Sequence, residues 1–189
     1  MKVWHLKEFL DNYFDVYKKL AFDPAIYPVI DRFRALALRI QQSNNKLMLA
    51  GNGASATISA HGAFDFTKQG KVRATTFNEP GLITCFSNDY GYENWVGEAI
   101  KSYADAGDAV VLISVSGSSP NVVNAAKVAK QMGLDVVAFT GRHADNPLRK
   151  LADIDFWVDS HAYNIVEGIH SIWLTAVIDA VIGKSVYET

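Results

Sequence analysis

The sequence predicts one α/β domain, with a five-stranded parallel sheet between two layers of helices. The first observation is a set of five short apolar segments, at 46–51, 72–77, 109–115, 135–141 and 154–159. Unbroken apolar runs of this length are typical of strands buried on both faces of a parallel sheet. The second observation is that segments with helical periodicity lie between them. This alternation predicts a three-layer α/β/α sandwich.

The N-terminal part of the chain predicts two helices. Residues 9–22 carry apolar and aromatic side chains at helical spacing. A second helix is expected after them, with Pro24 at a first-turn position. No linker, repeat or low-complexity run divides the chain, so we predict one domain over 1–189. Residues 1–45 form its N-terminal helical segment, which packs on the core or on a partner subunit.

The remaining helices are expected around the strands. Helical spacing predicts them over 55–69, 92–107, 119–133 and 162–183. Gly133 closes the third of these, and glycine is the residue type preferred just past a helix C-terminus. Ligands of such sheets bind beyond the carboxyl ends of the strands, which directs attention to the loops that follow them.

Composition excludes several functional classes. The formal net charge of -2 lacks the basic excess of a general nucleic-acid-binding protein. The single cysteine, Cys85, rules out an intrachain disulfide framework and fits a reducing compartment. The N-terminus lacks the apolar core of a signal peptide, and no stretch approaches the roughly 20 apolar residues that span a bilayer. We therefore expect a cytoplasmic protein that binds neither nucleic acid nor membrane.

Two loops that follow predicted strands are suited to binding an anion. Residues 51–55, Gly-Asn-Gly-Ala-Ser, combine glycines for close backbone approach with the free N–H groups of a helix start. Residues 114–119 place four serines around Gly117, and hydroxyls and backbone amides suit a phosphate. Neither loop contains Lys or Arg, which argues against a nucleoside triphosphate. No nucleotide cofactor is expected.

These loops carry a resemblance to a known family. "GNGASA" (51–56), "SNDYGYENWV" (87–96) and "ISVSGSSPNVVNAAKVAKQMGLDVVAFTGR" (113–142) together resemble the SIS (sugar isomerase) domain family, which has a flavodoxin-like fold. The branch they resemble is phosphoheptose isomerase. The resemblance implies a sugar phosphate substrate and a homotetramer with active sites shared between subunits. It also implies that the substrate is bound by Asn52, Gly53, Ser55, Asp89, Ser114, Ser116 and Ser119.

His61 and Asp65 are four residues apart on the helix after the first loop, so they share one face. Aldose–ketose isomerisation needs a base for a C–H proton and an acid for the oxygens, or a divalent metal that polarises the carbonyl. The family has a histidine and a glutamate at the matching places, where both can bind zinc and the glutamate acts as the base. The resemblance therefore implies that Asp65 is the base. A zinc site at His61 and Asp65 stands as an alternative to an ordinary ion pair.

The last helix departs from the family pattern of a glutamine followed by a glutamate, with a catalytic histidine two turns later. When the glutamates are aligned, Val166 and Leu174 occupy the positions of the glutamine and the histidine. Glu167 and His170 lie three residues apart and share a face. We predict that His170, with Glu167, protonates or polarises the substrate oxygen. The alternative is an exposed pair without a catalytic role.

The resemblance implies an intramolecular oxidoreductase, an aldose–ketose isomerase. It would convert sedoheptulose 7-phosphate to a heptose 7-phosphate through an enediol, for the synthesis of heptose in surface polysaccharides such as lipopolysaccharide or capsule. Two alternatives stay open. The apolar Val166 and Leu174 favour a non-catalytic SIS protein that binds a phosphosugar in regulation. The shortened carboxylate at Asp65 permits an isomerase of a different sugar phosphate.

Overall fold

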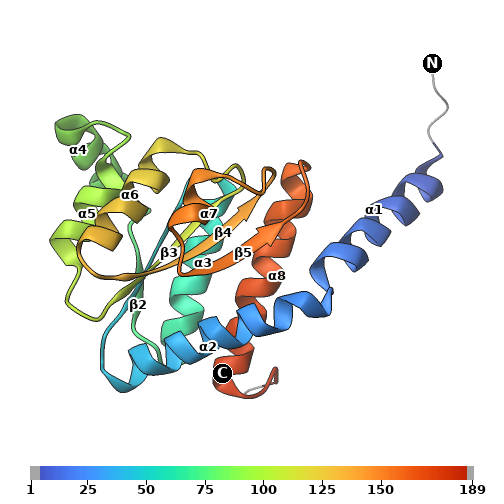
Figure 1. Cartoon of the computed structure of the whole chain (residues 1–189), viewed down its shortest axis with the longest axis horizontal. Coiled ribbons are helices and arrows are strands. Elements are labelled where there is room, and N and C mark those ends of the chain that lie inside the picture. The colour runs from blue at the N-terminus through green and yellow to red at the C-terminus, as the bar shows by residue number, and fades with distance from the viewer. Residues whose placement is uncertain (1–4, 187–189) are drawn as a thin grey trace.

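The five apolar segments form the predicted parallel sheet in the computed structural model, which describes residues 5–186 (Figure 1). The strands are β1 (Leu47–Gly51), β2 (Ala74–Thr76), β3 (Ala109–Ser114), β4 (Asp135–Gly141) and β5 (Ile154–Val158). Their order across the sheet is β2-β1-β3-β4-β5, which is the flavodoxin-like order. The direction of winding reverses between β1 and β3, and a ligand crevice is expected at their carboxyl ends.

Helices cover both faces of the sheet. They are α1 (Leu6–Ala21), α2 (Tyr27–Gln42), α3 (Ala54–Lys68), α4 (Pro80–Tyr90), α5 (Trp95–Tyr103), α6 (Pro120–Gln131), α7 (Pro147–Leu151) and α8 (Tyr163–Ile182), with a 3₁₀ turn, η1, at Pro24–Ile26. Helices α4 and α7 were not predicted from the sequence. The Glu79 carboxylate caps α4 by accepting hydrogen bonds from the N–H groups of Gly81 and Leu82, at 2.9 and 2.7 Å.

Successive side chains of the inner strands point to opposite layers, which divides the core in two. Leu49 and Val111 pack with α2, α3 and α8 on one face of the sheet. Met48 and Val110 pack with α5, α6 and α7 on the other face. All residues of β1 and β3 are buried, which explains why these strands read as unbroken apolar runs.

Helix α8 corrects one expectation from the sequence. It has 20 residues with a mean hydropathy of 1.6, so by length and composition alone it is apolar enough to cross a membrane. In the fold, Ile169, Trp173 and Val177 are buried in the core layer shared with α2 and α3. A helix that packs against a sheet and several neighbouring helices is apolar around much of its circumference. Its position in the core accounts for its composition.

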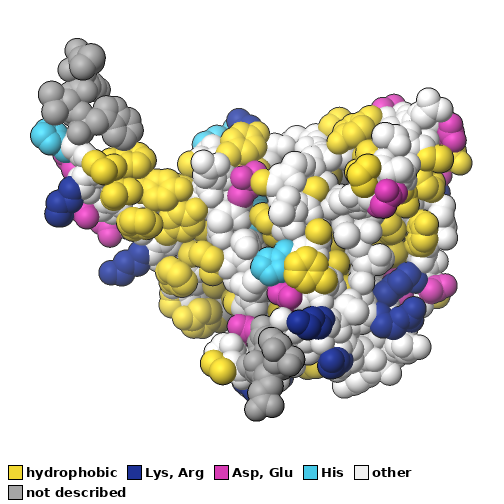
Figure 2. All heavy atoms as spheres, turned by 180° about the vertical axis from the view of Figure 1, so that it is seen from behind, with side chains coloured by type: hydrophobic (Ala, Val, Ile, Leu, Met, Phe, Trp, Pro, Cys, Tyr) yellow, Lys and Arg dark blue, Asp and Glu magenta, His cyan; other side chains and the backbone are white. Residues whose placement is uncertain are grey.

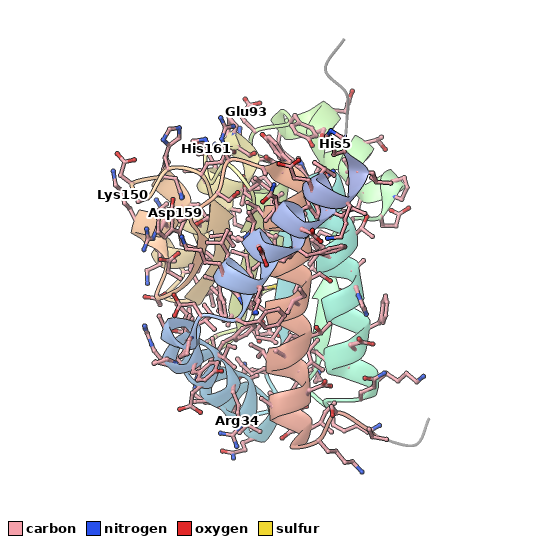
Figure 3. The ribbon with its side chains drawn as sticks, turned by 90° about the vertical axis from the view of Figure 1, so that its right-hand side faces the viewer. His5, Arg34, Glu93, Lys150, Asp159 and His161 are labelled. Carbon is pink, nitrogen blue, oxygen red and sulfur yellow. The ribbon has the colours of Figure 1, made fainter. Side chains whose placement is uncertain are left out.

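Helix α1 extends away from the body of the molecule and crosses α8 (Figures 1 and 3). It is held to α8 by the hydroxyl of Tyr17, which donates a hydrogen bond of 2.9 Å to the backbone carbonyl of Asn164. Apolar side chains line the length of this helix on the surface (Figure 2). They include Leu6 and Phe14, which are 65% and 61% exposed. An exposed apolar face of this extent marks a surface for association.

Candidate active site

The predicted loops meet at the carboxyl edge of the sheet. Gly51 of β1 pairs with Ile113 of β3, so the loops that follow these strands leave the sheet side by side. Between them lies a cavity of about 110 Å³. It is lined by Asn52, Ser55, Ile113, Ser114, Val115, Ser116, Ser119, Tyr163 and Glu167. Five of the residues predicted for substrate binding therefore share one cavity, together with Glu167.

The serine loop after β3 is shaped by a tight turn. The N–H of Gly117 donates to the carbonyl of Ser114 at 3.0 Å, and Gly117 has a φ of +61°. A Cβ at this position would collide with the side chain of Asn146, so only glycine fits. The turn brings the hydroxyls of Ser114 and Ser119 to 3.4 Å and presents Ser116 beside them. The loop gathers hydroxyl groups at the start of α6.

The loop after β1 is similar in design. Gly53, predicted to bind substrate, has a φ of +57° and is exposed directly before α3. Its contribution to the site is this backbone conformation, which starts the helix beside the cavity. Ser55 is buried in the first turn of α3 and lines the cavity. Two helices, α3 and α6, thus direct their N-terminal ends toward one cavity, which favours an anion there.

Two residues that hold Asn52, namely Asn121 and Tyr92, were not predicted as part of the site. Asn52 exchanges hydrogen bonds with Asn121 of α6, and the Tyr92 hydroxyl donates to Asn52 as well. Asn121 lies in "SSPN" and Tyr92 lies in "GYEN", inside two of the motifs that carry the family resemblance. Their polar side chains at the carboxyl edge were the available signal. Tyr163 was also missed, although it stands four residues before Glu167, on the same face of α8.

Helix α8 gives Glu167 to the cavity but directs His170 away from it. His170 is fully buried, and its Nε2 lies 3.0 Å from the carbonyl oxygen of Thr140. Burial lowers the pKa of the imidazole to about 4, against the smaller raising effect of that hydrogen bond. The predicted acid–base role of His170 does not fit this position, because an acid or base must be within reach of the substrate. The structure assigns His170 to the core.

The two family positions on α8 that hold apolar residues are core positions in this chain. Val166 is fully buried against Gly141, where an added Cβ would lie 2.8 Å from the valine side chain. Leu174 packs in the same way against Gly62 of α3, at 2.7 Å. These valine and leucine side chains fill space between α8 and its neighbours. Among the residues that the structure describes, no histidine lines the cavity.

Asp89 was predicted to contact the substrate, but the structure places it outside the cavity. It is exposed on α4, and its carboxylate accepts a hydrogen bond of 2.9 Å from its neighbour Asn88. Tyr92, three residues later, is connected to the cavity through the hydrogen bond that its hydroxyl donates to Asn52.

The predicted pair of His61 and Asp65 lies on α3, a helix that packs against α8. Its Nε2 and Oδ2 atoms are 3.0 Å apart, with side-chain exposures of 47% and 16%. Asp65 lies ten residues beyond Ser55, which is about 15 Å along the helix axis. Burial, and then the charge of Asp65, raise the pKa of Asp179 on α8. The pair therefore faces α8 and not the cavity of its own chain.

The donor set of this pair does not fit a complete metal site. A structural or catalytic zinc ion takes at least three protein ligands. Between residues 5 and 186, no group of three or more His, Cys, Asp or Glu side chains is placed to hold a metal. His61 and Asp65 supply two ligands at most.

A larger hollow of about 340 Å³ lies elsewhere, between the end of α1, η1 and the edge strand β5. It contains none of the residues predicted for the site. The smaller cavity at the carboxyl edge is therefore the candidate active site. Glu167 is its one charged lining residue among those described, and the rest are hydroxyls, amides and apolar groups. This chemistry suits a phosphate at the helix starts and a hydroxylated body near the carboxylate.

Comparison with known proteins places this architecture among sugar isomerase domains. Residues 27–141 match the SIS domain family, a range that contains both loops and ends before α8. The phosphoheptose isomerase of Fusobacterium nucleatum is 32% identical over 141 residues, which is 72% of each chain. That of Aliarcobacter butzleri is 29% identical over 181 residues, covering 92% of this chain and 93% of the relative.

Solved structures agree with the sequence relatives. The phosphoheptose isomerase of Neisseria gonorrhoeae superposes with a TM-score of 0.82 at 27% identity, covering 93% of this chain and 99% of that chain. A phosphoheptose isomerase from Francisella tularensis shares the fold with a TM-score of 0.86 at 21% identity, over 96% of this chain and all of the other. The similarity therefore extends across the sheet and its helices.

Proposed function

The chain belongs to the SIS domain family, and from its cavity we propose that it is a ketose–aldose isomerase that converts sedoheptulose 7-phosphate to a heptose 7-phosphate. The observation that carries this proposal is the joining of the loops after β1 and β3 into one hydroxyl- and amide-lined cavity at two helix starts. The similar proteins named phosphoheptose isomerase support the choice of substrate. The expected setting is the cytoplasm and the synthesis of surface polysaccharide.

The cavity holds the phosphate end of the substrate. Ser55, Ser114, Ser116 and Ser119 bring hydroxyls to it, and these can donate to phosphate oxygens without adding charge. Glu167 carries a negative charge that would repel the phosphate, so it is suited to the sugar portion. There its carboxylate can accept hydrogen bonds from hydroxyl groups, or carry a proton to and from an oxygen.

The chemical step is the transfer of a proton between neighbouring carbons. A base removes the proton from C1 of the ketose, the electrons of the broken C–H bond form the enediol, and the C2 oxygen receives a proton. The proton is then returned to C2 while the C1 hydroxyl loses its own, which leaves the aldehyde. We assign the base to Asp65, since a carboxylate is basic enough for this role and the family places its base here.

The position of Asp65 supports an active site shared between subunits. Asp65 lies about 15 Å along α3 from the cavity of its own chain, too far to take a proton from a substrate held there. Two apolar surfaces favour assembly: the face of α1 around Phe14, and Phe64, which is 57% exposed beside His61. We propose a homotetramer in which Asp65 of one subunit serves the cavity of another.

We propose that any zinc ion at His61 and Asp65 is shared between two subunits. One chain offers two ligands, His61 and Asp65, so a complete metal site would need ligands from a second subunit. No step above is routed through a metal.

The test of catalysis is the incubation of the protein with sedoheptulose 7-phosphate in deuterated water, with and without added zinc. The proposal predicts formation of the aldose and exchange of the transferred proton. Absence of both would exclude the isomerase. Exchange with other ketose phosphates but not this one would point to a different sugar phosphate as substrate.

The test of the shared site is complementation. Asp65→Asn removes the base but keeps the cavity, and Ser116→Glu adds a carboxylate to the cavity but keeps the base. Each variant alone should be inactive. When the two are co-expressed and assembled together, sites that combine an intact cavity with an intact Asp65 should recover activity. Recovery by mixing is not expected if each subunit carries a complete site.

A second candidate function is the binding of a phosphosugar without turnover. The observation that favours it is the position of His170 in the core, together with the apolar packing of Val166 and Leu174. Binding of sedoheptulose 7-phosphate, measured by calorimetry, without proton exchange would establish this function in place of the first.

A further inference from the structure

The side chain of Asn52 is held from two sides at the rim of the cavity. Its Nδ2 donates to Oδ1 of Asn121 at 3.0 Å, and Nδ2 of Asn121 donates back to Oδ1 of Asn52 at 2.8 Å. The hydroxyl of Tyr92 donates to the same Oδ1 of Asn52 at 3.1 Å. The two carboxamides therefore form a reciprocal pair, with a tyrosine as a third member.

The hydrogen-bonding capacity of Asn52 determines what it can offer a ligand. A carboxamide oxygen accepts two hydrogen bonds, and its nitrogen donates two. Both acceptor positions of Asn52 are taken, one by Asn121 and one by Tyr92. One of its two N–H groups is taken by Asn121, and the other has no partner among residues 5–186. Since Asn52 lines the cavity, the group it can still present there is a donor.

We propose that Asn121 and Tyr92 are positioning residues, which orient the carboxamide of Asn52 so that an N–H and not the carbonyl oxygen faces the bound phosphate. This proposal rests on the proposed phosphosugar-binding function of the cavity. An unheld asparagine can rotate its amide by half a turn and present oxygen, which repels phosphate oxygens. If the amide is already fixed before the ligand binds, the orientation that presents oxygen is removed. Binding then carries no entropy cost for selecting the orientation that presents the N–H.

The location of the two residues argues that they serve the ligand and not only the fold. Tyr92 is 54% exposed, so its hydroxyl adds little to the free energy of unfolding, because water can replace the bond it makes. Asn121 is 1% exposed in the first turn of α6. A buried amide is costly unless its hydrogen bonds are made, and here they are made to Asn52.

The proposal also explains how the segment 87–96 reaches the site. The residue of this segment expected to touch the substrate, Asp89, is exposed on α4. Tyr92 follows the end of α4 and crosses to the loop after β1, 40 residues away in sequence. The segment thus acts on the ligand through Asn52, as a support behind the binding residue.

The experiment compares two tyrosine-to-phenylalanine variants, of which only one removes a hydrogen bond to Asn52. Tyr92→Phe removes the hydroxyl that holds Asn52. Tyr90→Phe is the matched control, since Tyr90 is similarly exposed at 50% and its ring contacts Phe86 on α4. We expect Tyr92→Phe to raise KM for sedoheptulose 7-phosphate about 3- to 10-fold, with an equal rise in the inhibition constant of inorganic phosphate. The kcat and the melting temperature should stay at the values of the control.

A second variant strengthens the test. Asn121→Asp keeps an acceptor for the N–H of Asn52 but replaces the donated N–H with a charged oxygen near the phosphate. We expect KM to rise about 10- to 100-fold, with little change in kcat. If Asn121→Asp does not fold, the surface variant Tyr92→Phe still decides the question.

The outcomes separate this proposal from the proposed function. The positioning role is overturned if Tyr92→Phe and Tyr90→Phe both turn over the sugar with the same KM and the same inhibition constant for phosphate. This result leaves the isomerase proposal intact. Absence of turnover, with calorimetric binding of inorganic phosphate that is weaker in Tyr92→Phe, supports the positioning role and excludes the isomerase. A wild-type protein that neither turns over the sugar nor binds phosphate overturns both.

Discussion

The loop at 51–55 and the pair of His61 and Asp65 that follows it differ in whether one chain supplies all of their surroundings. The loop lines a cavity together with other segments of the same subunit, at the ends of β1 and β3 and the starts of α3, α6 and α8. His61 and Asp65 form an ion pair on the surface of α3, with α8 as its neighbour. The loop therefore belongs to a cavity formed within one chain, whereas the ion pair is presented on the surface.

This difference teaches that, under the proposed function, substrate binding and catalysis depend on separate groups of residues. The parallel sheet brings distant loops to one edge, so phosphate binding needs no partner. The 15-residue helix α3 then places Asp65 away from that edge, where, under the proposed function, it would serve the cavity of another subunit. Changes in the cavity should therefore alter KM, and changes at Asp65 should alter kcat.

Asp65→Asn is expected to have the largest effect. Removal of the base should lower kcat by about 10²- to 10⁴-fold, because a neutral amide cannot take up the proton. The cavity is untouched, so calorimetry should give an unchanged affinity for sedoheptulose 7-phosphate. A variant that keeps its kcat would place the base elsewhere, with Glu167 the next residue to replace.

The pH dependence of stability tests whether α8 gives its histidine to the core. In the unfolded chain the pKa of His170 is 6.5, and in the fold it is lowered to about 4, so the unfolded state takes up the proton first. Stability from this group is present above pH 6.5 and is lost as the pH falls toward 4, by about 3 kcal/mol in total. Urea unfolding across this range measures the loss.

His170→Leu provides the comparison for that measurement. It should remove this component of the pH dependence while kcat per folded molecule stays near the wild-type value. A collapse of kcat in a folded His170→Leu protein would return the histidine to the active site.

Ser116→Ala is expected to have a smaller effect, and of the opposite kind to Asp65→Asn. The loss of one hydroxyl from the cavity should raise KM about 3- to 10-fold and leave kcat unchanged, at a cost of about 1 kcal/mol in binding. Thermal unfolding should be nearly unaffected, since Ser116 is only partly buried. If the melting temperature falls while affinity holds, the serine is a structural residue of the turn.

His61→Ala should have the smallest effect on stability. The pair with Asp65 is partly exposed, and exposed pairs four residues apart on a helix contribute about 0.2–0.5 kcal/mol. Urea unfolding at neutral pH should therefore differ little from wild type. A large destabilisation would show that the pair holds α3 to α8, and would weaken the interpretation of this surface as part of a shared site.

Much of the fold and half of the site were predictable from the sequence. The strands at 47–51 and 109–114 were identified because full burial makes them continuously apolar. The serines were predicted to bind phosphate because four of them surround one glycine in a loop that directly follows a buried strand. The position of His170 was not predictable. Helical spacing places Glu167 and His170 near each other on α8, but it does not say which of the two faces the cavity and which is buried in the core.

The sequence by itself determined the order of the strands along the chain, the two loops and the identity of the polar groups they carry, because these depend on local pattern. Only the tertiary structure decided which of those groups share a cavity. Asn121 and Tyr92 reach Asn52 from 69 and 40 residues away, and Asp89, in the same motif as Tyr92, does not line the cavity. Such contacts depend on how helices rotate against a sheet, and that rotation is set by packing across the whole core, not by any one segment.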